Sequence, residues 1–92
     1  MALSGQKTVT TAGTAVNLGS QAVSHGLLVK ALPDNTGLVY VGNDGAGDVA
    51  STNGYPLSAG EVLIFEHVSN LGAIMVDSAV NGEGVAWLIL GA

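Results

Sequence analysis

Hydrophobic and β-branched residues in this chain occur in short runs, and glycine, asparagine or proline separates one run from the next. No run keeps a helical period beyond one turn, whereas residues 14–18 alternate with the period of two that marks a half-buried strand. We expect strands at residues 7–11, 14–18, 27–32, 38–41, 62–67, 73–77 and 85–90. This spacing predicts an all-β fold, a small antiparallel β-sandwich or jelly roll of seven to eight short strands.

The strongest local signal is the pair of apolar runs at 27–32 and 38–41. Turn-forming residues stand between them: Pro33, Asp34, Asn35 and Gly37. Proline presets φ, aspartate and asparagine bond back to the local backbone, and glycine accepts positive φ. The sequence therefore predicts a β-hairpin at this point.

Two segments after this hairpin are predicted to be irregular. Residues 43–54 contain four glycines and no hydrophobic pattern, so we expect an exposed loop. Residues 55–60 are expected to be a connection, because Pro56 disfavours a regular strand.

Residues 62–65 and 85–90 are apolar at odd and even positions alike. A strand of a two-layer sandwich normally turns one face to water. Strands that are apolar on both faces therefore indicate that something covers the face away from the core. A loop or the N-terminal segment is one candidate cover, and another subunit is the one we favour. The predicted subunit interface consists of Leu63, Phe65, Trp87 and Ile89.

The N-terminal residues 1–6 are small or polar and uncharged, which is typical of a flexible arm rather than of a core strand. The arm would precede a single β-sandwich domain at residues 7–92. A domain this small has a thin core and usually needs disulfides, metals or oligomerisation. Because the chain has no cysteine, oligomerisation is the expected compensation.

The composition argues against two classes of partner, nucleic acids and anionic membranes. Lys7 and Lys30 are the only basic residues besides the histidines, and the formal net charge is −5. A nucleic-acid binder or a polybasic membrane contact needs clustered cations, so neither is expected. Charged residues make up 10%, against about 25% in ordinary domains. So few charges suggest that part of the apolar surface contacts other subunits.

The residues that could carry chemistry have simpler structural explanations. His25 and His67 occur without the spacing of a zinc site, and we interpret them as ordinary histidines at strand edges. Asp44 and Asp48 are best explained as turn formers, with calcium binding as the alternative. A Ser-His-Asp triad has no G-x-S-x-G elbow to support it. We therefore predict no catalytic residues, no metal site, no cofactor and no enzyme activity.

Several motifs taken together resemble a known family. They are VTTAGTAV at residues 9–16, KALPDNTGLVYVG at 30–42, STNGYPLSAGE at 51–61 and VDSAVNGEGVAWL at 76–88. These motifs resemble small virion proteins of tailed bacteriophages, which occur as capsid decoration (cement) proteins and as head-fibre or tail modules. The match covers most of residues 7–90, and it consists of turn and strand patterns.

The resemblance implies a β-sandwich or jelly-roll fold, self-association and no enzymatic activity. We expect a virion protein on the capsid exterior, made in the host bacterial cytoplasm, that binds the major capsid protein and stabilises the assembled head, with a homotrimer favoured. The expected capsid contact is the arm (Met1, Ala2, Leu3, Ser4, Gly5 and Gln6), whose deletion should abolish head binding while leaving the fold intact. The alternative is a receptor- or glycan-binding module of a head fibre or tail that uses the loop at residues 43–54.

Overall fold

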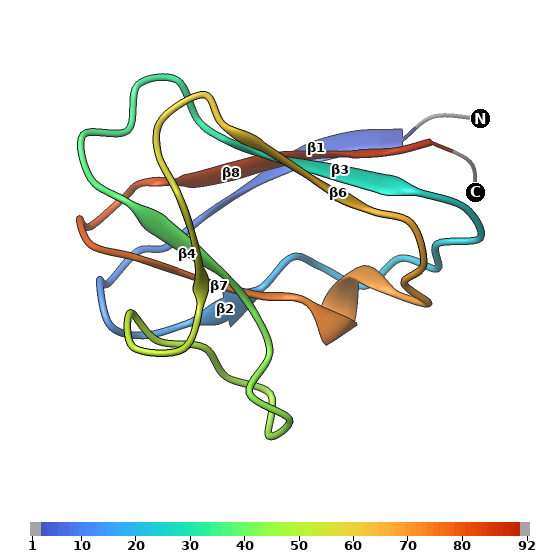
Figure 1. The fold of residues 1–92 in the computed structure, drawn as a ribbon, viewed down its shortest axis with the longest axis horizontal. Helices are drawn as coiled ribbons and strands as arrows, with labels where there is room; N and C mark the ends of the chain where they lie inside the picture. Colours follow the sequence, from blue (N-terminus) through green and yellow to red (C-terminus); the bar gives the residue numbers. More distant parts are fainter. Residues whose placement is uncertain (1–2, 91–92) are drawn as a thin grey trace.

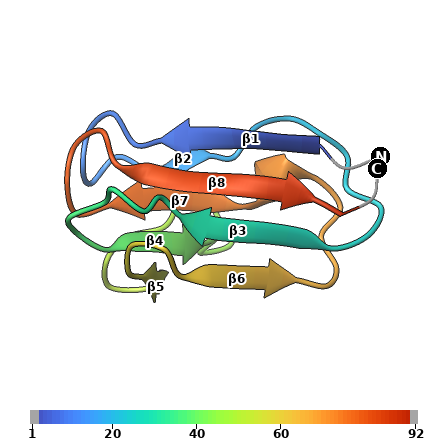
Figure 2. The same ribbon diagram turned by 90° about the horizontal axis from the view of Figure 1, so that it is seen from above.

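The computed structural model describes residues 3–90 as two four-stranded antiparallel sheets packed face to face (Figures 1 and 2). The strands are β1 (Leu3–Thr8), β2 (Val16–Asn17), β3 (Leu27–Ala31), β4 (Val39–Gly42), β5 (Tyr55–Leu57), β6 (Val62–Phe65), β7 (Met75–Ser78) and β8 (Gly84–Ile89). A single 3₁₀ turn, η1 (Leu71–Ala73), precedes β7. The prediction of an all-β sandwich is confirmed.

The strand order is β1-β8-β3-β6 in one sheet and β2-β7-β4-β5 in the other. Four antiparallel pairs, β1·β8, β2·β7, β3·β6 and β4·β5, describe one long two-stranded ribbon that doubles back between β4 and β5. Rolling this ribbon brings β8 beside β3 and β7 beside β4. This arrangement is a jelly roll, in which two Greek keys share the two sheets.

The core lies between the sheets and is built from alternating residues. In β3, Leu27, Val29 and Ala31 are buried while Lys30 is exposed, so one face of the strand points inward. Val39 and Val41 of β4 supply the facing side chains from the other sheet. Burial of this apolar surface is the main favourable term in folding the chain.

The predicted hairpin at residues 27–41 is wrong, because β3 and β4 belong to different sheets. The turn residues form an arch that bonds to Glu83 and Gly84, at the start of β8. Asn35 donates from Nδ2 to the Gly84 carbonyl (2.9 Å), and the Glu83 carboxylate accepts from the Thr36 and Gly37 amides (2.7 and 3.0 Å). The turn at residues 33–37 is thus held by hydrogen bonds to a distant segment of the chain and not by pairing with the next strand.

The predicted flexible arm is also wrong for Leu3–Gln6, which form most of β1. Each residue of β1 has a partner in β8, from Leu3 opposite Ile89 to Thr8 opposite Gly84. Gly5 lies under the Trp87 indole, where an added Cβ would approach the ring to 2.6 Å. This close packing explains why a glycine-containing polar segment forms a strand. Met1 and Ala2 lie outside the described residues.

The predicted connection at 55–60 contains a short strand, β5, although it includes Pro56. β5 lies at the edge of its sheet beside β4, and a proline without an N–H is tolerated in an edge strand. The loop predicted at residues 43–54 has no strand, as expected.

Candidate interaction surface

The β1-β8-β3-β6 sheet has an apolar surface on the side away from the core. Strand register places Leu88, Leu28 and Ile64 in one row across the sheet and Ala86, Lys30 and Val62 in the next. In β1 the two rows end at Ser4 and Gln6. We call this surface the outer face; it comprises Ser4, Gln6, Leu28, Lys30, Val62, Ile64, Ala86 and Leu88.

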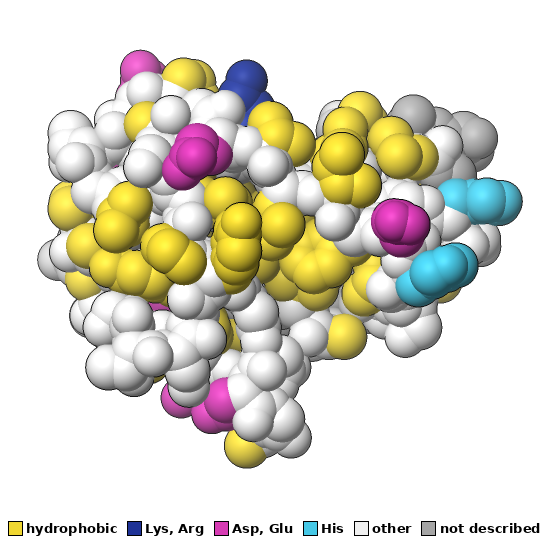
Figure 3. All heavy atoms as spheres, viewed as in Figure 1, with side chains coloured by type: hydrophobic (Ala, Val, Ile, Leu, Met, Phe, Trp, Pro, Cys, Tyr) yellow, Lys and Arg dark blue, Asp and Glu magenta, His cyan; other side chains and the backbone are white. Residues whose placement is uncertain are grey.

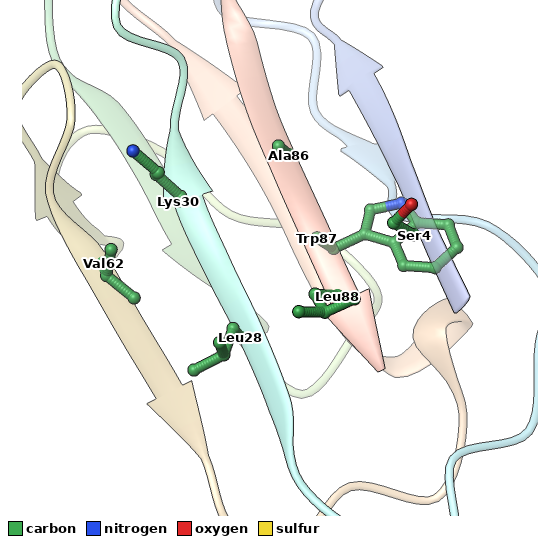
Figure 4. A pocket seen from close by; sticks show the side chains of 7 residues that line it. All are labelled: Ser4, Leu28, Lys30, Val62, Ala86, Trp87 and Leu88. Carbon is green, nitrogen blue, oxygen red and sulfur yellow. The ribbon is translucent and has the colours of Figure 1, made fainter. Parts of the chain in front are cut away.

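The outer face includes the two most exposed valine or isoleucine side chains of the described residues. Val62 is 52% exposed and Ile64 is 61% exposed, and Leu90, just after β8, is 50% exposed. An open hollow of about 300 Å³ lies on this face, with a nearly all-apolar lining that includes Leu28, Val62 and Leu88 (Figure 4). Lys30 is the one charged residue of the outer face. Such a surface suits contact with another protein better than binding of a polar substrate.

The four residues predicted as a subunit interface lie on the opposite side of the same strands. Ile89 is fully buried, and Leu63, Phe65 and Trp87 are half-buried and pack against the core. The structure brings these four side chains together between the sheets, where they hold the sandwich together. The four predicted residues are the inward-facing ones of their strands, and self-association itself stays a prediction.

Sequence reasoning missed Leu28, Val62, Ile64 and Leu88 as outer-face residues. One signal was available: Lys30 has to face water, so Leu28, two residues before it, shares its face. Residues 62–65 include no polar residue that would indicate which face of the strand is exposed. Only the pairing with β3 determines that face.

The structure places the residues of the predicted capsid contact in different environments. Ser4 and Gln6 belong to the outer face, Leu3 packs against the core, and Gly5 lies under Trp87. The indole Nε1 of Trp87 is buried without a hydrogen-bond partner. Residues 3–6 therefore contribute a paired strand to any contact, with two polar side chains directed outward.

Both imidazoles are exposed and lie outside the strands. His25 precedes β3 and His67 follows β6, and the pairing of Leu27 with Phe65 places them at the same end of the sheet. Among residues 3–90, no group of three or more histidine, cysteine or acidic side chains is arranged to hold a metal ion.

Asp44 and Asp48 are turn formers within the loop at residues 43–54. Asp44 Oδ1 accepts from the Ala46 amide and Asp48 Oδ1 accepts from the Val49 amide, both at 2.8 Å. The Asp44 amide donates to the Asp48 carbonyl (2.8 Å), which closes the loop on itself. The loop oxygens thus accept hydrogen bonds from nearby amides, as Asx turns do.

Two further carboxylates hold turns in place. Asp77 is buried, and its Oδ1 accepts from the Gly13 amide (2.9 Å) and the Ser78 amide (2.8 Å). Hydrogen bonds from the Thr36 and Gly37 amides lower the pKa of the Glu83 carboxyl below its usual 4.5, against a smaller opposing effect of desolvation. Glu83 is therefore a structural residue that holds the turn before β4.

Comparisons with protein-family models, with curated proteins and with solved structures gave no match to this chain. Within residues 3–90, no helix has the length and apolar character that crossing a membrane requires.

Proposed function

We propose that this protein is a structural virion protein that decorates and stabilises the outside of a tailed-phage capsid. The observation that carries the proposal is the outer face, where Val62 and Ile64 are more than half exposed beside Leu28 and Leu88. An apolar surface of this kind on a small domain marks a contact with another protein. The motifs that resemble phage virion proteins supply the class of partner, the major capsid protein of an assembled head.

The mechanism is binding without chemistry. A protein that binds the assembled lattice, and not its dissociated subunits, stabilises the lattice by its binding free energy. Many copies on one head multiply this effect, and copies joined to each other gain further by multivalency. Self-association of the chain belongs to the proposal, with a homotrimer favoured.

The test is co-sedimentation with purified heads that lack the protein. Leu88 lies in the middle of the outer face, opposite Leu28 and Ser4, so Leu88→Lys places a charge at the centre of the contact. We expect Leu88→Lys to weaken head binding by at least about tenfold, because the ammonium group must lose water or stay unpaired. The control is Val80→Lys, which changes a 38% exposed side chain in the turn before β8.

Equal head binding by Leu88→Lys and the unchanged protein would contradict the role of the outer face in binding the capsid. Binding of the isolated protein to cells or to a glycan array, with no binding to heads, would instead favour a receptor- or glycan-binding module that uses the loop at residues 43–54.

A further inference from the structure

One edge of the sandwich is unprotected against pairing with another strand. The two sheets have four edge strands, β1, β6, β2 and β5. β2 has two residues, β5 has three and includes Pro56, and β1 carries Ser4, Gln6 and Lys7. These are features by which proteins avoid edge-to-edge association. β6 has four residues, Val62–Phe65, and none of them is polar, charged or proline.

The main-chain groups of Val62 and Ile64 point out of this edge. Leu32 donates to the Gly84 carbonyl and Leu90 donates to Gly26, so even-numbered residues of β3 bond to β8. Ala31 donates to the Glu61 carbonyl, so odd-numbered residues of β3 bond to odd-numbered residues of β6. Because hydrogen bonding alternates along an antiparallel strand, the N–H and C=O groups of Val62 and Ile64 face away from β3.

Figure 3 looks onto the edge formed by β5 and β6. Hydrophobic side chains cover much of it, with both imidazoles and a carboxylate at one end. The exposed main-chain groups of β6 therefore lie within an apolar surface.

We propose that β6 pairs antiparallel with β6 of a second copy of this chain, about a two-fold axis at Ile64. Side chains opposite each other in an antiparallel pair lie on the same face, so Ile64 meets Ile64 and Leu63 meets Phe65 across the axis. The outward N–H and C=O groups of Val62 and Ile64 then form hydrogen bonds. The pairing joins two four-stranded sheets into one of eight strands.

Charge complementarity selects a second copy as the occupant and fixes this register. Val62 lies between Lys30 of its own chain and Glu66 of the second copy, which places the ammonium and the carboxylate in one row of the outer face. Two strand spacings of about 4.8 Å separate their backbones, a distance that these two long side chains span. In a register shifted by one step, with Leu63 opposite Leu63, Val62 would face Ile64 and Glu66 would face Gly60, farther from Lys30.

The contact also enlarges the outer face. Four strands with about five residues each cover on the order of 300 Å², well below the roughly 800 Å² that each partner buries in a standard interface. Pairing through β6 makes the two outer faces continuous and doubles this area. The proposal rests on the self-association that belongs to the proposed function, but it pairs two copies where that function favours a trimer, and its test uses the isolated chain without capsids.

The first experiment measures mass by size-exclusion chromatography with light scattering and by sedimentation equilibrium. The 9.1 kDa chain is expected to form a dimer in the micromolar range. Ile64→Lys places two ammonium groups at the axis and should weaken dimerisation by at least about tenfold. Val80→Lys, at a 38% exposed position in the turn before β8 and away from β6, is the matched control and should leave dimerisation unchanged. A monomer at about 0.5 mM, a trimer, or a dimer insensitive to Ile64→Lys would overturn the proposal.

The second experiment reverses charges at two exposed positions that do not support the core. Lys30→Glu and Glu66→Lys should each weaken the dimer, and the double variant should restore it to within about threefold, because both pairs across the axis are re-formed. Asp34→Lys changes net charge as Glu66→Lys does, at an exposed position in the arch before β4, and should have no effect. Failure of the double variant to recover would overturn the register. Loss of head binding by a variant that still dimerises would bear on the capsid role alone.

Discussion

At the scale of single residues, Glu83 shows how this charge-poor chain uses a carboxylate. Its two oxygens accept three hydrogen bonds from Thr36 and Gly37, which belong to the arch between β3 and β4. Asn35 adds a bond to Gly84 next to it. Ionised acceptors make stronger hydrogen bonds than neutral ones, so the arch is held most firmly when Glu83 is charged.

This arrangement predicts acid sensitivity. Because the pKa of Glu83 is lowered in the folded protein, its contribution to stability is present above the unfolded value near 4.5 and is lost as pH falls through the folded pKa. Urea unfolding midpoints measured from pH 7 to pH 3 should fall in the acid range. The decrease should be smaller in Glu83→Gln, which is expected to be less stable than the unchanged protein at pH 7. Parallel curves for the two proteins would contradict the role of Glu83.

At the scale of elements, β1 and β6 are the two edges of one sheet but differ in composition. β1 is polar and closes the sheet against β8, with Gly5 allowing the Trp87 ring to pack over it. β6 is apolar on both faces and leaves main-chain groups unpaired. One edge therefore completes the fold, and the other is available for association.

Deletion of residues 1–8 is expected to destabilise the domain, because β8 loses a six-residue partner and the indole of Trp87 becomes exposed. A loss of about 3 kcal/mol, comparable with exposing one or two large side chains, would lower Tm by roughly 12–24 °C. Thermal unfolding followed by circular dichroism measures this shift. Deletion of residues 1–2 is the control, and an unchanged Tm after the longer deletion would restore the interpretation of residues 1–6 as an arm.

At the scale of the whole molecule, the jelly roll separates charge from apolar surface. The chain carries a net charge of −5, yet Lys30 is the one charged residue among the eight that form the outer face, and Glu66 lies just past the end of β6. Docking through this face should therefore depend on apolar burial rather than on long-range attraction.

Head binding is accordingly expected to change by less than about threefold when NaCl is raised from about 0.05 M to about 0.5 M, because salt screens exposed charges but not apolar contact. Co-sedimentation at the two salt concentrations provides the measurement. A decrease of more than about tenfold would indicate a charge-driven contact elsewhere on the molecule.

The amino-acid sequence by itself determined the β class and the places of most strands, and its two lysines are too few to form a polybasic patch. Alternation, β-branched runs and glycine or proline punctuation are local properties, and a charge count needs no fold. Residues 62–65 and 85–90 could also be recognised as apolar on both faces.

The tertiary structure alone decided which face of each strand is buried and which strands pair. Turn residues such as Asn35 are satisfied equally well whether the chain returns to the same sheet or crosses to the other, so the hairpin and the arch look alike in sequence. In Val62–Phe65 no polar residue marks a side, and only the pairing with β3 turns Leu63 inward and Ile64 outward. β1 became a strand because β8, from the far end of the chain, lies beside it, and contacts between such distant segments leave no local signal.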